Sequence, residues 1–364
     1  MIALLSLLIW LFLFFAHGYF WQSGPELPVG TPPEFPDVDI IVPARDEAHT
    51  IAPVIRSLLA QDYAGRFQVV LVDDNSTDGT GALAGEAANL TVITLQSKPK
   101  EWSGKLWALA QGVAASRAPL LLFTDADIVH DPRHLSSLVA KLLQSRLGLV
   151  SEMVRLNCAS LAERALIPAF VYFFQMLYPF NQVNDPRSRV AAAAGGTVLM
   201  RREILQRIGG IDAIKQSLID DVALARAVKA SSSIFLGHSG LAVSIRPYEN
   251  FVDIWQMISR TAFTQLRHSA VLLGVTLIGL TILWWVPGAV ILFGHGWQRA
   301  LGFAAFALSA VSYLPTLSRF GRNRLWALAL PLIALFYMAA TCGSALNHWR
   351  GGGTHWKSRA YDAD

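Results

Sequence analysis

The chain has 364 residues, of which 53% are hydrophobic and only 15% are charged, whereas soluble domains carry roughly 25% charged residues. This composition excludes an intrinsically disordered chain and an ordinary soluble cytosolic protein. The formal net charge of +4 is too small an excess to indicate a nucleic-acid partner, but it suits an anionic membrane surface. The two cysteines, Cys158 and Cys342, have no metal-ligand spacing and indicate reduced thiols rather than a disulfide scaffold.

The first 21 residues form an apolar run that is long enough to cross a hydrocarbon core of about 30 Å as a helix. A cleaved signal peptide is the alternative, but it would begin with a basic residue and end at small residues. Here the first basic residue is Arg45, and the run closes with bulky aromatics. We therefore expect an N-terminal transmembrane anchor over residues 1–21, followed by a linker over residues 22–37.

Residues 38–250 alternate short β-branched runs with longer amphipathic runs, a pattern that predicts a mostly parallel α/β sheet flanked by helices. In such sheets the ligand binds beyond the carboxyl ends of the strands, so residues that follow a strand are candidates for a site. Strands are expected at residues 38–42, 67–72, 90–95, 120–124 and 147–153, and helices at 48–61, 105–115 and 134–145.

Carboxylates follow two of these strands. The second strand runs into Asp73 and Asp74, in a turn that would by itself be an ordinary strand-to-helix connection. The fourth strand ends in the sequence TDAD, where Asp125 and Asp127 share one face of an extended chain. One carboxylate can hold a divalent cation that is completed by water and substrate phosphates, and Lys105 at a helix start could reach the same phosphates. A solvated acidic turn is the alternative.

A second acidic cluster begins a predicted helix about 95 residues later, at Asp220 and Asp221. Capping of the helix N-terminus would explain these two residues in isolation. Upstream, Gly195, Gly196 and Thr197 lead into a segment whose spacing indicates a strand, a short helix and a Gly-rich turn. We expect this segment to shape a pocket near the two aspartates.

In chain order, these motifs resemble those of family 2 glycosyltransferases with the GT-A nucleotide-sugar fold, over about residues 36–265. The motifs are IIVPARDE, VVLVDDNSTDGT, GKLWALAQG, FTDAD, GGTVLMRRE with RIGGID, and IDDVALA. With its membrane runs, the chain is similar to the lipid-directed branch that includes ceramide glucosyltransferases. It also resembles bacterial hopene-associated glycosyltransferases, partly through residues 355–361 of the tail.

The resemblance implies an inverting, metal-dependent hexosyltransferase that moves one sugar from a nucleoside-diphosphate sugar to a membrane lipid, such as a hopanoid or another lipid hydroxyl. It also implies a role for each residue singled out above. On the donor side, Asp73 and Asp74 would contact the nucleoside with Arg45 and Glu47 nearby, and Lys105 would lie near the nucleotide. Asp127 would be the principal ligand of Mn²⁺ or Mg²⁺, and Asp125 would bind the ribose or assist the metal. On the acceptor side, Asp221 would be the general base, and the acceptor pocket would be lined by Gly195, Gly196, Thr197 and Asp220.

One departure from the family pattern bears on the product. Processive synthases carry Gln-x-x-Arg-Trp after the base, and the matching residues 257–261 keep Arg260 but lack the Gln and the Trp. The missing aromatic favours transfer of a single sugar over chain growth, so a processive polysaccharide synthase is the nearest alternative. Arg260 would neutralise the diphosphate, although a cation at the membrane surface fits it equally.

Two further alternatives stand outside this reaction. A nucleotidyltransferase could share the sheet and a metal carboxylate, but it would need a Gly-rich loop after the first strand, where this chain has PARDE. A non-catalytic membrane scaffold would use the acidic turns only as helix caps.

Residues 271–347 contain four arginines and no Asp, Glu or Lys. Three apolar runs, at about 271–293, 299–316 and 325–346, predict a C-terminal membrane region over residues 271–346. We expect an interfacial helix with Arg260 before it, over residues 251–270, and a basic tail after it, over residues 347–364.

Flanking arginines favour a catalytic domain that faces the cytoplasm. The resemblance to bacterial enzymes implies that the membrane is the bacterial inner membrane. Three full crossings would leave the basic tail outside, so the run broken by Pro287 is expected to be re-entrant or interfacial.

The aromatic segment 165–180 is too short to span a bilayer comfortably, and it is either a core helix of the α/β domain or an interfacial helix that guides the lipid.

Overall fold

The computed structural model describes residues 1–351, 355–356 and 359–360 of the chain. These residues form two compact units. The sheet unit comprises Pro25–Asn157, Gln182–Pro247 and the end of the tail, and the helical unit comprises Met1–Gly24, Cys158–Asn181 and Tyr248–Gly352. Much of the expected basic tail, including part of the stretch 355–361, lies outside the described residues.

The sheet unit is built on a mixed sheet of eight strands in the order β3-β2-β1-β4-β7-β6-β8-β5, as far as the chain is described. Neighbouring strands pair in parallel, except that β7 is antiparallel to β4 and β6, and β5 is antiparallel to β8. The strands are β1 (Val38–Ala44), β2 (Phe67–Asp73), β3 (Leu90–Thr94), β4 (Leu120–Thr124), β5 (Ile128–His130), β6 (Leu149–Arg155), β7 (Thr197–Arg201) and β8 (Ile234–Ser244), and in the tail β9 (His355–Trp356) pairs with β10 (Arg359–Ala360).

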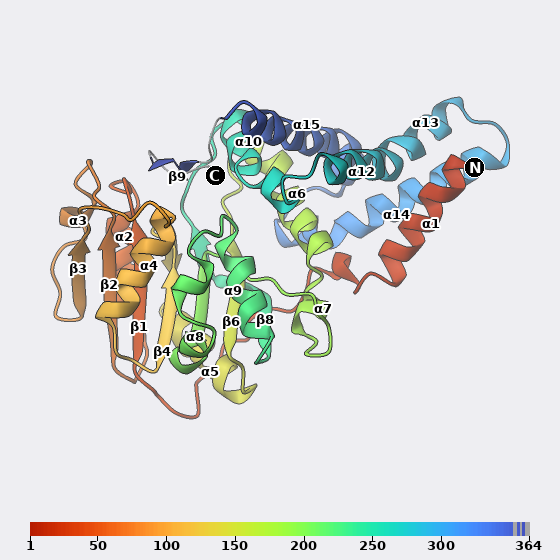
Figure 1. The fold of residues 1–364 in the computed structure, drawn as a ribbon. Helices are drawn as coiled ribbons and strands as arrows, with labels where there is room; N and C mark the ends of the chain where they lie inside the picture. The colour runs from red at the N-terminus through yellow and green to blue at the C-terminus, as the bar shows by residue number, and fades with distance from the viewer. Residues whose placement is uncertain (352–354, 357–358, 361–364) are drawn as a thin grey trace. The chain divides into compact units, whose positions relative to one another are not determined.

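Helices cover the sheet, which explains why its central strands are buried along their whole length. Every residue of β1 and β4 is buried, as expected for parallel strands that are packed on both faces. Figure 1 shows α4 (Gly104–Ala115) in front of β1 and β2. The other helices of this unit are α2 (Ile51–Leu59), α3 (Thr80–Leu83), α5 (His134–Gln144), α8 (Arg202–Arg207), the 3₁₀ turn η2 (Ile211–Ile214) and α9 (Asp220–Lys229). The boundary between the two units along the sequence falls within α7 (Phe180–Asn184).

The topology gathers the carboxyl ends of the parallel strands at one edge of the sheet. Ala44 at the end of β1 pairs with Asp73 at the end of β2, and β4 runs parallel to β1. Because β7 is antiparallel to β4, it starts at this edge, where Thr197 pairs with Thr124. The segments predicted to carry the site therefore meet at one edge.

The five strands expected from the sequence are confirmed, with ends that move by at most two residues. The strand, short helix and turn expected after Gly196 are also confirmed, as β7, α8 and Gly209-Gly210. Two strands of the eight-stranded sheet, β5 and β8, were not expected. β5 has only three residues, and glycines at 237 and 240 interrupt the apolar pattern of β8.

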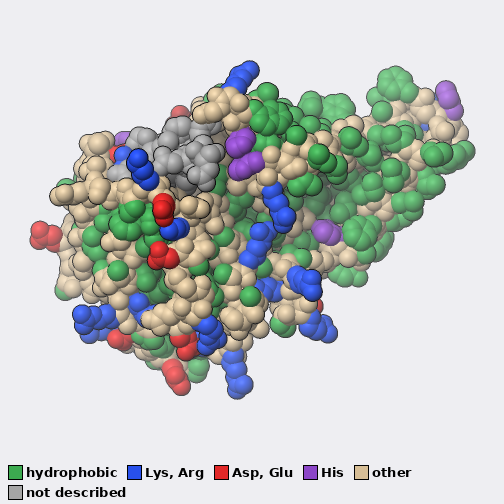
Figure 2. All heavy atoms as spheres, viewed as in Figure 1, with side chains coloured by type: hydrophobic (Ala, Val, Ile, Leu, Met, Phe, Trp, Pro, Cys, Tyr) green, Lys and Arg blue, Asp and Glu red, His purple; other side chains and the backbone are tan. Residues whose placement is uncertain are grey.

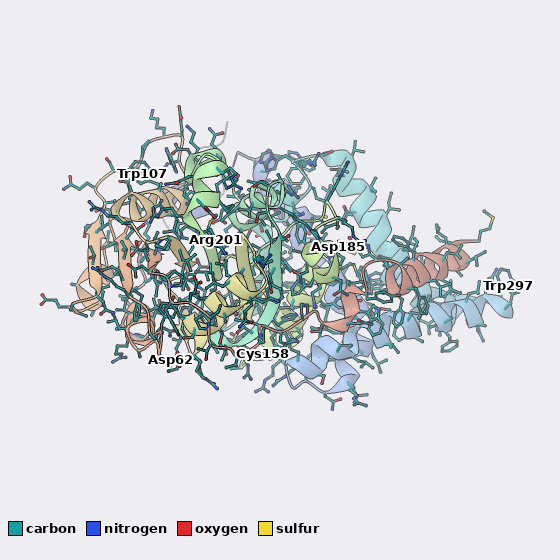
Figure 3. The ribbon with its side chains drawn as sticks, turned by 90° about the horizontal axis from the view of Figure 1, so that it is seen from below. Asp62, Trp107, Cys158, Asp185, Arg201 and Trp297 are labelled. Carbon is teal, nitrogen blue, oxygen red and sulfur yellow. The ribbon has the colours of Figure 1, made fainter. Side chains whose placement is uncertain are left out.

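The helical unit contains three stretches that are long and apolar enough to cross a membrane by length and composition, within the described residues. They are Ala270–Phe293, Trp297–Arg319 and Arg324–Trp349. The face of these helices that Figure 2 shows is largely hydrophobic (green). Trp297 at the start of α14 is exposed at the end of this unit (Figure 3). The helices are α1 (Ile2–Phe15), η1 (Phe20–Gln22), α6 (Leu161–Leu177), α10 (Phe251–Ser259), α11 (Ala262–Gln265), α12 (Ala270–Leu280), the π turn η3 (Thr281–Trp285), α13 (Val286–Phe293), α14 (Trp297–Arg319), η4 (Arg324–Ala329) and α15 (Leu330–Trp349).

Three expectations for these segments were wrong in detail. The first run forms a helix of only 14 residues, about 21 Å long, because the chain turns at Gly18 and Tyr19, which have positive φ angles. Residues 1–21 are therefore not one membrane-crossing helix. Pro287 does not break its run, because the helix continues from Ala270 to Phe293 and a π turn just before Pro287 adjusts the backbone around the missing N–H. Residues 251–270 are not one helix, since α10 ends at Ser259 and α11 starts at Ala262.

The aromatic segment forms α6, which begins with a capping box between Ser160 and Glu163. This helix belongs to the helical unit, so the expected domain over residues 38–250 does not include residues 158–181. Inside the helical unit, the Tyr172 hydroxyl lies 2.7 Å from the Ser312 hydroxyl, and the Tyr337 hydroxyl donates to the Leu166 carbonyl. The interpretation of α6 as a core helix of the α/β domain is therefore wrong, and its place at a membrane interface stays a prediction.

Candidate functional site

The turns that follow β1 and β2 are locked together at the sheet edge. The Thr77 backbone N–H donates to Asp46 Oδ1 at 2.8 Å, and the Asp46 N–H donates to Ser76 Oγ at 3.0 Å. The Glu47 N–H donates to Thr80 Oγ1 at 2.8 Å. Asp46 has a φ of 48°, in the left-handed region that non-glycine residues adopt rarely. These reciprocal bonds hold the backbone in that conformation and fix where Glu47 lies.

Asp73, Asp74 and Arg45 lie beneath this rim. Asp73 Oδ1 accepts a hydrogen bond from the Ser76 N–H at 3.0 Å and so closes the turn. The Asp74 carboxylate is fully buried, and Arg45 Nη1 lies 3.6 Å from its Oδ2. Contact between a nucleoside and the Asp74 carboxylate would therefore need a local rearrangement, and the nucleoside role of this pair stays a prediction.

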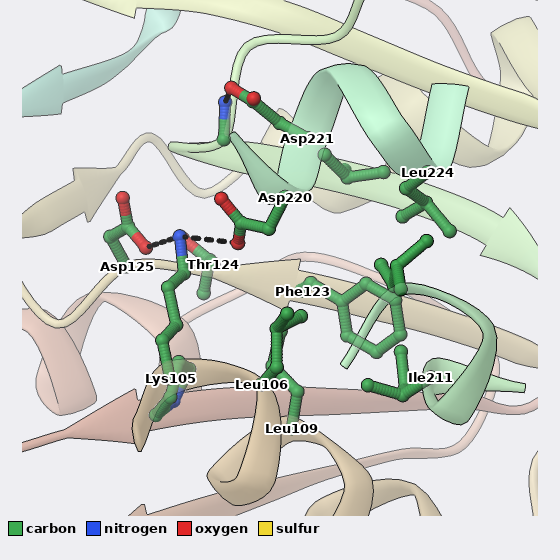
Figure 4. A pocket seen from close by; sticks show the side chains of 14 residues that line it. Lys105, Leu106, Leu109, Phe123, Thr124, Asp125, Ile211, Asp220, Asp221 and Leu224 are labelled. Atoms are coloured by element: carbon green, nitrogen blue, oxygen red, sulfur yellow. Dashed lines mark hydrogen bonds and ion pairs between the residues drawn. The ribbon is translucent and has the colours of Figure 1, made fainter. Parts of the chain in front are cut away.

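Lys105 is the centre of a second group of charges. It stands in the first turn of α4, where Ser103 Oγ caps the helix by accepting from the Leu106 N–H. Its Nζ lies 2.9 Å from Asp125 Oδ1 and 3.4 Å from Asp220 Oδ2 (Figure 4). Burial lowers the pKa of Lys105, but the two carboxylates outweigh it and hold the pKa above its usual value.

Asp221 lies beside this group and is held by two backbone donors. The Gly195 N–H donates to Asp221 Oδ2 at 2.9 Å, and the Val222 N–H donates to Oδ1 at 2.7 Å. Burial and the neighbouring Asp220 raise the pKa of Asp221 to about 7, although Lys105 and the two N–H groups oppose the rise. Asp221 can therefore accept a proton near neutral pH.

A small hollow, open to solvent, is lined by Lys105, Asp125, Asp220 and Asp221. One side carries Lys105 and the acidic residues, and the other side is apolar (Figure 4). Gly195 lines the hollow, and a Cβ at this position would come within 3.2 Å of Asp221 Oδ2. The apolar side is formed by Leu106, Leu109, Phe123, Val198, Ile211, Ile214 and Leu224.

Gly196 and Thr197 lie outside the lining of the hollow and contact the turn that contains Asp125. The Gly196 carbonyl accepts from the Asp125 N–H at 3.2 Å and from Thr124 Oγ1 at 3.0 Å. Thr197 is fully buried at the start of β7. These two residues hold the turn at Asp125 in place, whereas only Gly195 and Asp220 of the expected acceptor pocket line the hollow itself.

Arg246 is a site residue that the sequence reasoning missed. It follows β8, and its guanidinium bridges two carboxylates from different strands. Arg246 Nε lies 2.5 Å from Asp127 Oδ2, and Nη2 lies 2.6 Å from Glu47 Oε1. A prediction of β8 would have revealed it, because Arg246 stands just beyond the carboxyl end of that strand.

The site offers few side chains that could bind a divalent cation. No cluster of three or more His, Cys, Asp or Glu side chains able to hold a metal occurs among the residues that the structure describes. A hard divalent cation needs only one or two carboxylates when water and substrate phosphates supply the other oxygens. Asp127, assisted by Asp125 two residues earlier, fits this donor set.

The structure thus brings together most of the residues singled out in the sequence. Glu47 and Asp127 meet through Arg246, and Asp125, Asp220 and Asp221 meet around Lys105. Arg260 is exposed at the end of α10 in the helical unit, so its role in the site stays a prediction.

Residues 39–209 match the sequence model of the family described as Glycosyl transferase family 2, so the chain contains a domain of this family. A mannosyltransferase from Pyrobaculum calidifontis, solved in complex with GDP-Man and Mn²⁺, is 18% identical with a TM-score of 0.56, and the match covers 99% of this chain and 100% of that chain. The fold is therefore the GT-A glycosyltransferase fold, as the motifs predicted.

Curated relatives match the chain over part of their length. The probable glycosyltransferase YdaM of Bacillus subtilis is 24% identical over 52% of this chain and 46% of its own length. A beta-monoglucosyldiacylglycerol synthase of Nostoc is 24% identical over 61% of this chain and 51% of its own length. The chain thus spans about half the length of these relatives. The family resemblance is confirmed, whereas the narrower resemblance to hopene-associated and ceramide glucosyltransferases stays a prediction.

Proposed function

We propose that this chain, with its family 2 glycosyltransferase domain, is a membrane-bound enzyme that transfers one sugar from a nucleoside-diphosphate sugar to a lipid hydroxyl, with inversion at the anomeric carbon. The observation that carries the proposal is the hollow at the carboxyl edge of the sheet, where Asp125, Asp220 and Asp221 converge on Lys105. This arrangement combines a cation for a departing diphosphate with a carboxylate that can take a proton.

The donor side of the reaction falls to Lys105, Asp125 and Asp127. Lys105 can stabilise the charge on the leaving diphosphate once the donor draws it away from Asp125. Asp127, assisted by Asp125, would hold Mn²⁺ or Mg²⁺. The bound cation would neutralise the diphosphate as the bond to the sugar breaks. The mannosyltransferase structure with GDP-Man and Mn²⁺ supports this type of donor and cation.

On the acceptor side, Asp221 is the proposed general base. The acceptor hydroxyl attacks the anomeric carbon and loses its proton to the Asp221 carboxylate, while the bond from that carbon to the diphosphate oxygen breaks on the opposite face. One substitution of this kind inverts the configuration. The Gly195 and Val222 N–H groups hold the Asp221 carboxylate in place through both oxygens.

A membrane lipid is proposed as the acceptor because three helices are long and apolar enough to span a bilayer. The name of the Nostoc relative, a beta-monoglucosyldiacylglycerol synthase, points to a lipid product of that protein. Within this class, a hopanoid or another lipid alcohol is the narrower proposal. Arginines before and between the apolar helices favour a catalytic domain that faces the cytoplasm. An inner-membrane location is proposed from the family resemblance, and Arg260 is proposed to neutralise the charge of the diphosphate.

The test is to incubate the purified full-length chain with a panel of sugar nucleotides, Mn²⁺ or Mg²⁺, and total membrane lipid, and to identify new glycolipids by mass spectrometry. We expect a single added hexose from one donor. A polymer of the labelled sugar would favour the processive synthase instead. If the chain neither binds a nucleotide diphosphate with either cation nor forms a product, the scaffold interpretation would replace the enzyme.

A further inference from the structure

Arg246 forms an ion pair with Asp127, the carboxylate that the proposed function assigns to the cation. Its guanidinium lies between Asp127, which follows β4, and Glu47, which follows β1. The two carboxylates are nearly enclosed, with 11% of each side chain exposed, whereas 34% of the Arg246 side chain is exposed. A partly exposed guanidinium that joins two enclosed carboxylates can leave one of them without unfolding its surroundings.

Both carboxylates of the TDAD turn already have a cationic partner from the chain. Lys105 Nζ lies 2.9 Å from Asp125, and Arg246 Nε lies 2.5 Å from Asp127. A divalent cation on Asp127 would stand within a few ångströms of the guanidinium. Like charges at that distance repel strongly in a partly enclosed site. The cation and Arg246 therefore compete for the Asp127 carboxylate, whose Oδ2 contacts the guanidinium.

We propose that Arg246 is an exchangeable counter-ion of the cation site. It neutralises Asp127 in the free protein and gives up this carboxylate when the divalent cation arrives, while Glu47 keeps hold of the guanidinium. This inference rests on the cation role that the proposed function gives to Asp127. It follows that Arg246 weakens cation binding in the absence of a donor. The negative charge of a diphosphate then favours the exchange.

The alternative is that Arg246 is a fixed structural link between β8 and the TDAD turn. A backbone hydrogen bond already makes this link, because the Ile245 N–H donates to the Asp127 carbonyl at 2.9 Å. The structural link therefore does not depend on the guanidinium. A fixed link predicts that loss of Arg246 destabilises the protein without strengthening cation binding, so the two interpretations give different results.

The test measures Mn²⁺ binding to the full-length chain by isothermal titration calorimetry, with no nucleotide present. We expect Arg246→Gln to bind Mn²⁺ at least fivefold more tightly than the unaltered chain. The matched control is Arg133→Gln, which removes the same charge from an exposed pair with Asp131 outside the site. It should change the affinity less than twofold. Measurements at 0.15 M salt limit the effect of distant charges, because the screening length is then about 8 Å.

Arg246→Lys provides a second variant in case the glutamine variant does not fold. A lysine keeps the charge but lacks the planar fork that spans two carboxylates, so we expect a smaller increase in Mn²⁺ affinity in the same direction. Unchanged or weaker Mn²⁺ binding in both variants would overturn the proposal, as would an absence of Mn²⁺ binding in every chain. If the variants bind Mn²⁺ no better but the unaltered chain forms a glycolipid, only the exchange fails. If Arg246→Gln tightens Mn²⁺ binding but no glycolipid forms, only the proposed function fails.

Discussion

The pH dependence of transfer should report the charges around Asp221. Because burial and Asp220 raise its pKa to about 7, Asp221 is largely protonated in the free protein below that pH. A general base must be deprotonated to act, so kcat/KM should fall about tenfold for each pH unit below this value and level off above it. The falling part of the pH profile is its acid limb. Changes in the charges near Asp221 should move this limb along the pH scale.

Two substitutions should move the limb in opposite directions. Lys105 Nζ and Asp221 Oδ2 lie 3.5 and 3.2 Å from the position of a Cβ on Gly195, so they are no more than about 7 Å apart. At that distance a unit charge contributes about 2 kcal/mol at an effective dielectric constant of about 20, or roughly 1 to 2 pKa units. Lys105→Gln should therefore move the limb to higher pH by roughly this amount. Asp220→Asn removes a like charge and should move it to lower pH.

The assay is kcat/KM for glycolipid formation across the pH range, because this ratio reports ionisations of the free enzyme. Only the position of the limb is compared, so a loss of donor affinity in the Lys105 variant does not affect the result. A limb that stays in place in both variants, or moves the same way in both, would refute the electrostatic account of Asp221.

Three further substitutions test other parts of the structure. Gly195→Ala places a Cβ within 3.2 Å of Asp221 Oδ2 and should displace the base. We expect kcat/KM to fall about tenfold while the melting temperature is unchanged. Full activity would show that this contact is harmless. Gly112→Ala places a Cβ 2.4 Å from Ile41 Cγ2, between α4 and β1. Thermal or denaturant unfolding should show that the free energy of unfolding falls by about 1–3 kcal/mol. An unaltered free energy of unfolding would contradict the packing described. Asp127→Asn should abolish the response of activity to added Mn²⁺ or Mg²⁺ in a metal titration, and an unaltered titration curve would exclude Asp127 as the ligand.

The sequence predicts the parts of the fold in which burial is continuous. β1 and β4 are apolar at nearly every position and stand directly before the charged turns, so both the strands and the residues after them could be identified. β8 could not be identified, because Gly237, His238 and Gly240 interrupt its apolar run. Arg246 was missed for the same reason, since its importance depends on the strand that precedes it.

Ion pairing was also beyond the reach of the sequence. The motifs indicated which carboxylates matter, but they could not indicate that Lys105 joins Asp125 to Asp220, because these residues lie on elements far apart in the chain. Nor could they show that Asp74 is fully buried beside Arg45. Such contacts depend on the tertiary arrangement of the sheet edge, which local patterns do not encode.

Parallel measurements of donor binding and turnover in Asp221→Asn test the central claim most directly. Asparagine keeps the shape of the side chain but cannot accept the acceptor's proton, so the donor dissociation constant should stay within about threefold while turnover falls by about 10² or more. Normal turnover in this variant would contradict the assignment of Asp221 as the base. Loss of donor binding together with turnover would also contradict it, because Asp221 would then support the nucleotide sugar rather than the proton transfer.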